Sequence, residues 1–350
     1  MFKLKEKFLI ALGISLTIII VVTLFTVDAS TWTALQEINI YYLVLITAVT
    51  IMAWLLNGLK LKVLSSGVGF KLKLFKAVEL GLIDRFFSNI TPSGIGGQPI
   101  KTAAMMKFDI SSGKASAVVV VELLLRLLFF VFSLPFVIYK ISDLFFDYVS
   151  PIYLNIGVAV LITTLIIVIY LMLYKVEYLL KLSFSLLNLK LFKKIIGKKK
   201  VYSWKRILAE EIRIFNSTIW TYLKSGLIEI FSAFLLTIML WMLRFTVLYF
   251  IIKGFNLEVD LSFIILIQLL IYTAVLFIPI PGGSGIEVLL AAILSRFFPL
   301  SLVGIITALW RFFTYYSYIF VGSFISFKIF KIQEDVENIE MNKIDGGYKN

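Results

Sequence analysis

The chain has 350 residues, of which 60% are apolar and only 16% are charged, an apolar share well above that of soluble domains. It contains no Cys and no His, which excludes disulfides, thiolate metal sites, a Cys nucleophile and the usual general base. The composition therefore excludes an ordinary soluble enzyme and predicts an integral membrane protein. We expect no cofactor and no metal ion. In a membrane protein, basic residues mark the cytoplasmic loops, so the net charge of +13 is a signal of topology.

Runs of about 20 apolar residues predict helices that span a membrane. Six clear runs occur, at about 8–27, 40–59, 115–139, 152–174, 228–252 and 301–327. Two further apolar runs, at about 75–90 and 262–298, are interrupted by Pro and Gly. Because these residues stop or bend helices, the two runs are not expected to form simple spans.

Basic residues in the connecting loops predict which loops face the cytoplasm. They are frequent in 1–7, 60–76 and 175–225, and scarce in 28–39, 140–151 and 253–260. The first three segments are therefore predicted to be cytoplasmic and the other three external. This places a multi-pass protein in the cell (plasma) membrane with both termini in the cytoplasm. It also accounts for most of the positive charge, so nucleic-acid binding is not expected.

The two interrupted runs are each predicted to leave and return on one side of the membrane. The first lies between Lys73 and the basic segment from Lys101 to Lys114, both placed in the cytoplasm. The second starts at the external Asp260, and the span that follows it ends inside near Lys328. Two re-entrant hairpins that enter from opposite faces satisfy these constraints. Pairs of ordinary short spans, giving about eight to ten helices, satisfy them as well.

The predicted fold class is an all-α polytopic membrane protein with about six spanning helices and two oppositely oriented re-entrant helical hairpins. The two halves have opposite topology and form an inverted repeat, with a first repeat at about 8–139 and a second at about 152–327. A single membrane domain at 1–330 is followed by a polar cytoplasmic tail at 331–350. Inverted repeats with broken helices recur in secondary transporters.

Both hairpin tips are rich in Gly and Pro. The first reads SNITPSGIGGQP at 88–99 and the second reads PIPGGSGIE at 279–287. Such loops expose backbone N–H groups and direct a helix N-terminus at a ligand, which suits a lipid phosphate; a plain tight turn is the structural alternative. The candidate binding residues are Asn89, Thr91, Pro92, Ser93, Gly96 and Gly97 in the first tip, and Pro281, Gly282, Gly283, Ser284, Gly285 and Glu287 in the second.

Ionisable residues inside apolar runs indicate function, because they are costly to place in a membrane. Glu122 and Arg126 are four residues apart and share one helix face, so they either neutralise each other or contact a substrate. Arg244 has no acidic residue within one helical turn, and Glu122 and Glu287 are its candidate partners. Arg311 has no local partner either, and its planar fork suits a phosphate.

The adjacent Asp84 and Arg85 do not face each other on a helix, so each is predicted to reach a different neighbour. A packing role and a substrate role are both open for these two residues.

The basic segment between the halves, at about 176–225, contains an apolar stripe with helical spacing. The stripe consists of Val201, Trp204, Leu208, Ile212 and Phe215. It predicts an amphipathic helix. The helix either lies on the anionic inner leaflet, held by the basic segment at 190–215, or packs against the underside of the helix bundle.

The two motifs, in a multi-span chain of this length, resemble the flippase-like membrane family typified by the transmembrane region of lysylphosphatidylglycerol synthases. The resemblance covers roughly residues 5–330, and the second motif is the more specific one. It implies movement or handling of a lipid, often an aminoacylated or glycosylated anionic phospholipid or a polyprenyl-linked intermediate. The family more often has an acidic residue where Gln98 stands, Arg where Lys101 stands, and one more residue before Glu287.

The leading expectation is a lipid translocase of the flippase type, with the headgroup of an anionic phospholipid or polyprenyl-linked intermediate held between the two tips. Bifunctional relatives carry aminoacyl transfer on a later soluble domain, and the sequence ends at Asn350 without one, so we expect no enzyme. The first alternative is an intramembrane lipid-modifying enzyme with Glu287 or Asp84 as base. The second is a non-transporting membrane partner of a lipid synthase or glycosyltransferase.

Overall fold

A computed structural model of the chain describes residues 36–91, 96–145, 198–277 and 285–329, with single helical positions between 156 and 174. These residues form helices and turns and no β-strand, which confirms the all-α prediction. The predicted span at 8–27, most of 152–174 and the tail at 331–350 lie outside the described residues.

Three of the described helices are long and apolar enough to cross a membrane. They are α3 (Ile40–Ser66), the part of α6 (Ser112–Phe145) up to Val137, and α11 (Leu227–Gly254). They coincide with the runs predicted at 40–59, 115–139 and 228–252. Large apolar side chains are exposed on their outer faces, including Phe132 on α6 and Phe231 on α11. An apolar surface of this kind requires lipid or protein around it.

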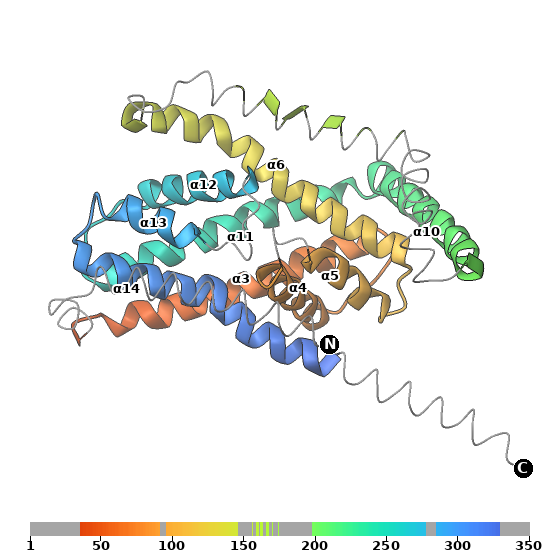
Figure 1. Ribbon diagram of the computed structural model, residues 1–350, viewed down its shortest axis with the longest axis horizontal. Helices are drawn as coiled ribbons and strands as arrows, with labels where there is room; N and C mark the ends of the chain where they lie inside the picture. Colours follow the sequence, from red (N-terminus) through yellow and green to blue (C-terminus); the bar gives the residue numbers. More distant parts are fainter. Residues whose placement is uncertain are drawn as a thin grey trace, which may run out of the picture.

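Helices α3 and α11 form an antiparallel pair that runs along the longest dimension of the molecule (Figure 1). At one end the amide of Asn39 donates to the carbonyl of Gly254 at 3.0 Å, which joins the start of α3 to the end of α11. At the other end the space beside Gly67, just after α3, is filled by Tyr222 and by Glu229 in the first turn of α11. The Asn39 side chain also caps α3 by accepting from the Tyr41 amide.

The two predicted hairpins are helical and lie toward opposite ends of the α3–α11 pair (Figure 1). The first consists of α4 (Leu74–Asn89) and α5 (Gly97–Met106), and the second of α12 (Leu261–Phe277) and α13 (Ile286–Leu294). Their opposite placement is the one that an inverted repeat requires. The inverted repeat itself, the re-entrant form of the hairpins, their depth in a membrane and the number of spans stay predictions.

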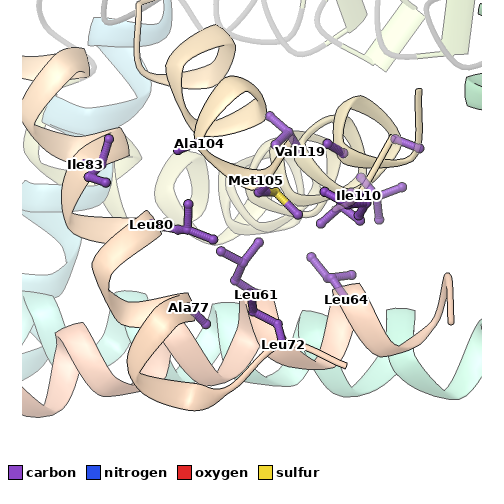
Figure 2. Packing of buried hydrophobic residues seen from close by; sticks show 14 of the residues in the cluster. Leu61, Leu64, Leu72, Ala77, Leu80, Ile83, Ala104, Met105, Ile110 and Val119 are labelled. Atoms are coloured by element: carbon purple, nitrogen blue, oxygen red, sulfur yellow. The ribbon is translucent and has the colours of Figure 1, made fainter. Parts of the chain in front are cut away.

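Two buried apolar clusters hold the hairpins against the long helices. Figure 2 shows the first, in which Leu61 and Leu64 near the end of α3 meet Leu80 of α4 and Met105 of α5. In the second cluster Ile46, near the start of α3, packs with residues of α12, α13 and the end of α11. A third cluster, which includes Phe130 of α6 and Trp241 of α11, packs these helices against α12, so each hairpin has its own apolar cluster and a further one joins α6, α11 and α12.

Close backbone contacts at glycine fix the position of α4. A Cβ at Gly58 of α3 would lie 2.9 Å from the Val78 amide nitrogen, and a Cβ at Gly322 would lie 2.7 Å from the Leu82 carbonyl oxygen. Small residues that let helices approach in this way are typical of packing in membranes. They bring the polar residues of α4 close to α3 and the C-terminal helix.

The run predicted as one span at 301–327 is helical from 300 to 329. It begins as α14 (Leu300–Arg311), passes through the π-helical turn η3 (Phe312–Tyr316), and continues as α-helix over 317–329.

Asp260 directly precedes α12 and accepts hydrogen bonds from the first turn of that helix. The donors are the Ser262 hydroxyl and the Phe263 amide, and these hydrogen bonds hold the pKa of the Asp260 carboxyl below its usual range.

The predicted amphipathic helix is α10 (Lys198–Ser225), and it packs on α6. Phe215 and Tyr222 are buried in the first cluster, the Tyr222 hydroxyl donates to the Leu64 carbonyl, and the Gly113 amide donates to Glu211. Of the two predicted positions for this helix, residues 211–222 therefore take the one packed against the helix bundle. The contact of the basic segment at 190–215 with lipid stays a prediction, because most of its side chains lie outside the described part of the chain.

Candidate functional site

A small polar cavity lies at the first hairpin, where α3, α4, α5, α6 and α11 meet. Five of its lining side chains are cations and two are carboxylates, which leaves a formal charge of +3. It is narrow, with room for little more than a water-sized group between its walls. The lining residues are Asn57, Lys60, Asp84, Arg85, Gln98, Lys101, Val119, Glu122, Leu123, Arg126, Leu240, Trp241 and Arg244.

Two lysines and two carboxylates form a buried ion-pair network on one side of the cavity. Lys101 of α5 donates to Asp84 of α4 at 3.0 Å and to Glu122 of α6 at 2.7 Å. Lys60 of α3 lies 2.9 Å from the other oxygen of Glu122. None of the four side chains is more than 11% exposed. The network joins four helices, and its own charges cancel.

The sequence at the start of α5 brings Lys101 to Asp84. A Cβ at Gly97 would collide with the carbonyl oxygen of Asp84 and the hydroxyl of Ser88, so only glycine allows α5 to begin this close to α4. Pro99 falls in the first turn of α5, where a missing N–H is tolerated. Lys101 lies one helical turn after Gly97, on the side of α5 that contacts α4, and its side chain reaches Asp84.

Three arginines supply the remaining charge of the cavity: Arg85 of α4, Arg126 of α6 and Arg244 of α11. All three are partly exposed, and none is in a salt bridge with a carboxylate of the described residues. The Nε of Arg126 is buried without a hydrogen-bond acceptor in the same part of the chain. These cations are not neutralised by the ion-pair network beside them.

Arg244 is positioned by aromatic side chains. Its Nη2 donates to the Tyr318 hydroxyl at 3.3 Å, and its guanidinium carbon lies 5.3 Å from the Trp241 ring centre and 5.8 Å from that of Tyr318. Such contacts hold a guanidinium without removing its charge. The expectation that Glu122 or Glu287 is its partner is wrong, because both carboxylates are occupied by other cations.

The pairing of Glu122 with Arg126 is also wrong, although the two residues share a face of α6. Glu122 is neutralised by Lys60 and Lys101, which approach it from neighbouring helices. Both Glu122 and Arg126 line the cavity, so their contact with a substrate stays a prediction.

The second hairpin contains an enclosed ion pair. Arg311 of α14 and Glu287 of α13 are joined through Nε and Oε1 at 2.7 Å, with side chains 5% and 0% exposed. The other Glu287 oxygen accepts from the Gly285 amide at 2.8 Å, and Gly285 has φ +98°, a conformation that glycine adopts readily. A carboxylate at the start of a helix is also favoured by the helix dipole. The phosphate-binding Arg311 expected from the sequence is therefore engaged by a carboxylate.

Tyr315 connects the two hairpin regions. Its hydroxyl donates to the Asn89 carbonyl at 3.0 Å, and the Asn89 amide group donates to the Tyr315 carbonyl at 3.4 Å. The Arg311 guanidinium carbon lies 3.9 Å from the centre of the Tyr315 ring. A continuous set of contacts thus runs from the first tip to the ion pair of the second hairpin.

The remaining predicted site residues fall into two groups. In the first tip, Thr91 accepts a hydrogen bond from the Gly96 amide at 3.0 Å and donates to the Phe87 carbonyl at 2.7 Å, so it joins the end of α4 to the start of α5. The others lie outside the described residues: Pro92, Ser93, Pro281, Gly282, Gly283 and Ser284.

Sequence reasoning missed the lysines of the site. The loop charges predict that Lys60 and Lys101 are cytoplasmic loop cations, yet the two residues are 5% and 2% exposed. The available signals were local: the helical pattern of α3 continues beyond Lys60, and Lys101 follows a Gly-Gly-x-Pro helix start. Their partners lie on other helices, which the sequence does not reveal. Among the described residues no group of three potential metal ligands occurs.

Comparisons with known proteins agree with the membrane fold. A "UPF0104 membrane protein" of Archaeoglobus fulgidus is 25% identical over 319 residues, which make up 90% of this chain and 94% of that relative. No solved structure matches the chain. The family described as the lysylphosphatidylglycerol synthase TM region matches residues 8–322, a range that includes both hairpins and every residue of the cavity. The chain therefore belongs to the membrane family of the lysylphosphatidylglycerol synthase TM region.

Proposed function

We propose that this membrane protein binds the anionic headgroup of a lipid in the cavity beside the first hairpin and moves it across the membrane. The observation that carries the proposal is the presence of three arginines that line one cavity and have no carboxylate partner among the described residues. Partly buried cations without counter-charges are costly. A phosphate neutralises them and accepts bidentate hydrogen bonds from their guanidinium groups.

A lipid is favoured over a soluble anion by the surroundings of the cavity. The helices that line it expose large apolar side chains outward, so the acyl chains of a bound lipid can stay in the bilayer while the headgroup enters. The name of the matched family refers to synthases of a phospholipid derivative, which supports the same class of ligand.

Movement is favoured over static binding by the arrangement of the halves. Two helical hairpins lie at opposite ends of an antiparallel helix pair, as in transporters that open alternately to either side. The cavity is too narrow for a phosphate, so the helices around it have to separate during binding. We place the protein in the cell membrane with cytoplasmic termini, as the loop charges predict.

A catalytic role is not part of the proposal. Asp84 and Glu122, the two carboxylates of the cavity, are each held within 3.0 Å of a lysine, which disfavours their use as a base. Incubation of the purified protein with radiolabelled lipid should therefore leave the lipid chemically unchanged. A labelled product would favour the intramembrane enzyme. A scaffold for a lipid synthase or glycosyltransferase does not account for three arginines in one cavity without carboxylate partners among the described residues.

The test is lipid movement in vesicles that contain the purified full-length protein. A fluorescent anionic phospholipid is placed in both leaflets, and an impermeant quencher reports how fast the inner-leaflet pool becomes accessible. We expect the wild type to speed this exchange and Arg85→Gln, Arg126→Gln and Arg244→Gln each to slow it by about tenfold or more, since a hydrogen bond to a charged group contributes about 1.5–3 kcal/mol.

The matched control is Arg296→Gln, because Arg296 is an exposed arginine outside the cavity. It should behave like the wild type. Wild-type rates in the triple arginine variant would contradict the proposed site, and a wild type that moves no anionic lipid would contradict the function.

A further inference from the structure

We infer that the headgroup accepted by this cavity carries at least two negative charges, as a phosphomonoester or a diphosphate does. The inference rests on the proposed function and narrows its substrate class. It separates such lipids from phosphodiesters, whose phosphate has one negative charge.

The first step is the charge balance of the cavity. Lys60 and Lys101 neutralise Asp84 and Glu122, so these four residues contribute no net charge. Three arginines remain. A phosphodiester leaves two of these charges uncompensated in a site with little water, whereas a phosphomonoester brings about −1.5 to −2 charges at neutral pH. A ligand with two or more charges removes most of the imbalance.

The second step is the direction from which the donors come. Arg85, Arg126 and Arg244 belong to three different helices, α4, α6 and α11, that surround one cavity. A phosphodiester has two unesterified oxygens, while a phosphomonoester has three. Because each guanidinium binds oxygens with a planar fork, a group with three free oxygens can engage all three arginines together.

The third step is a dependence on pH that belongs to the ligand. A phosphomonoester has its second pKa near 6, so it gains its second charge between about pH 5 and pH 7. The chain has no His. The charged and titratable residues that face the cavity are Lys60, Asp84, Arg85, Lys101, Glu122, Arg126, Arg244 and, through Arg244, Tyr318. Arginines stay protonated throughout this range, and both carboxylates are held by lysines.

The experiment compares two probes with identical acyl chains: dioleoyl phosphatidic acid, a monoester, and dioleoyl phosphatidylglycerol, a diester. Binding to the full-length protein in neutral micelles is followed by tryptophan fluorescence, since Trp241 lines the cavity. At pH 7 we expect the monoester to bind at least tenfold more tightly. Lowering the pH to 5 should weaken its binding by up to about tenfold, as the dianion is lost, and leave the diester unaffected.

Variants show whether the preference arises in the cavity. Arg126→Gln and Arg244→Gln should each reduce the preference for the monoester, and Arg296→Gln should preserve it. If a variant fails to fold, the pH dependence of the wild type still decides the inference. Soluble glycerol phosphate distinguishes the source of the phosphate: binding as tight as that of the lipid would keep the charge class and overturn the choice of a lipid.

Two outcomes separate this inference from the proposed function. Equal binding of monoester and diester at pH 7, with both weakened in the arginine variants, would overturn the inference and leave lipid binding at this cavity in place. A monoester affinity that does not change between pH 5 and pH 7 would also overturn the inference. If neither lipid binds, both the inference and the proposed function fail.

Discussion

Each hairpin region has an ion pair between the second limb of the hairpin and the helix that follows it, and the two pairs have opposite polarity. In the first, the second limb of the hairpin carries the cation Lys101 and the following helix carries the anion Glu122. In the second, the second limb carries the anion Glu287 and the following helix carries the cation Arg311. The difference lies in what surrounds each pair. The first borders a cavity with three further arginines, while the second is enclosed, with side chains 0% and 5% exposed.

The comparison indicates that similar motifs in two hairpin regions can have different roles. An ion pair that is enclosed and balanced fixes two helices relative to each other. An ion-pair network beside excess positive charge can fix helices and also present a binding surface. We therefore propose that the Glu287–Arg311 pair anchors two helices and that the region around Lys101 binds the headgroup.

The largest expected loss of stability follows from breaking the enclosed pair. Arg311→Leu leaves the carboxylate of Glu287 in a fully buried position, and breaking a buried pair in this way costs about 3–5 kcal/mol. In the double variant Glu287→Leu, Arg311→Leu most of the loss should be recovered, because no charge remains buried. The measurement is the free energy of unfolding in mixed micelles, followed by tryptophan fluorescence.

The control for this comparison is Lys76→Leu, which breaks a pair with Glu79 whose side chains are 45% and 25% exposed. This substitution should lower the free energy of unfolding by no more than about 1 kcal/mol.

The double variant Glu287→Leu, Arg311→Leu should also move lipid at the wild-type rate. A stable double variant without transport would place Glu287 and Arg311 in the substrate path, as the sequence alone suggests.

A smaller loss is expected in the first region. Lys101→Met removes the cation shared by Asp84 and Glu122, but Lys60 stays on Glu122 and three arginines border the same cavity. We expect a loss of about 2–3 kcal/mol, at or below the lower end of the range for a broken buried pair. Lys101→Arg keeps the charge and should lose less. A loss in Lys101→Met larger than that of Arg311→Leu would contradict the difference drawn between the two regions.

Within the described part of the chain, the sequence predicts the helices well and the side-chain partners across helices poorly. The run at 40–59 becomes α3, which continues to Ser66, because a lysine ends an apolar run but not a helix. Lys60 lies within α3 and pairs with Glu122 on another helix. Hydropathy therefore ends the helix too early. The Gly and Pro residues mark where the helices are interrupted, since α4 ends at Asn89 and α5 begins at Gly97, and α12 ends at Phe277 and α13 begins at Ile286.

The composition of the cavity, in contrast, depends on contacts between residues far apart in the chain. The sequence predicts a carboxylate partner for Arg244, yet this residue contacts Tyr318 and Trp241. No local sequence pattern distinguishes a tyrosine whose hydroxyl accepts a hydrogen bond from an arginine from a tyrosine that faces lipid. The same is true of Lys101 and Asp84, whose contact requires α5 to begin against α4.

The smallest expected effect concerns the link between the regions. Tyr315→Phe removes the hydroxyl that donates to Asn89 and keeps the ring beside Arg311, so it should cost about 1 kcal/mol, the contribution of one hydrogen bond. Tyr41→Phe, at a tyrosine that is 64% exposed, is the matched control and should have no effect. The informative measurement is a double-mutant cycle between Tyr315→Phe and the Glu287→Leu, Arg311→Leu pair. Because Tyr315 contacts Arg311 directly, we expect a coupling of about 0.5 kcal/mol or more. Simple additivity would mean that the two hairpin regions, although joined by contacts, are energetically independent.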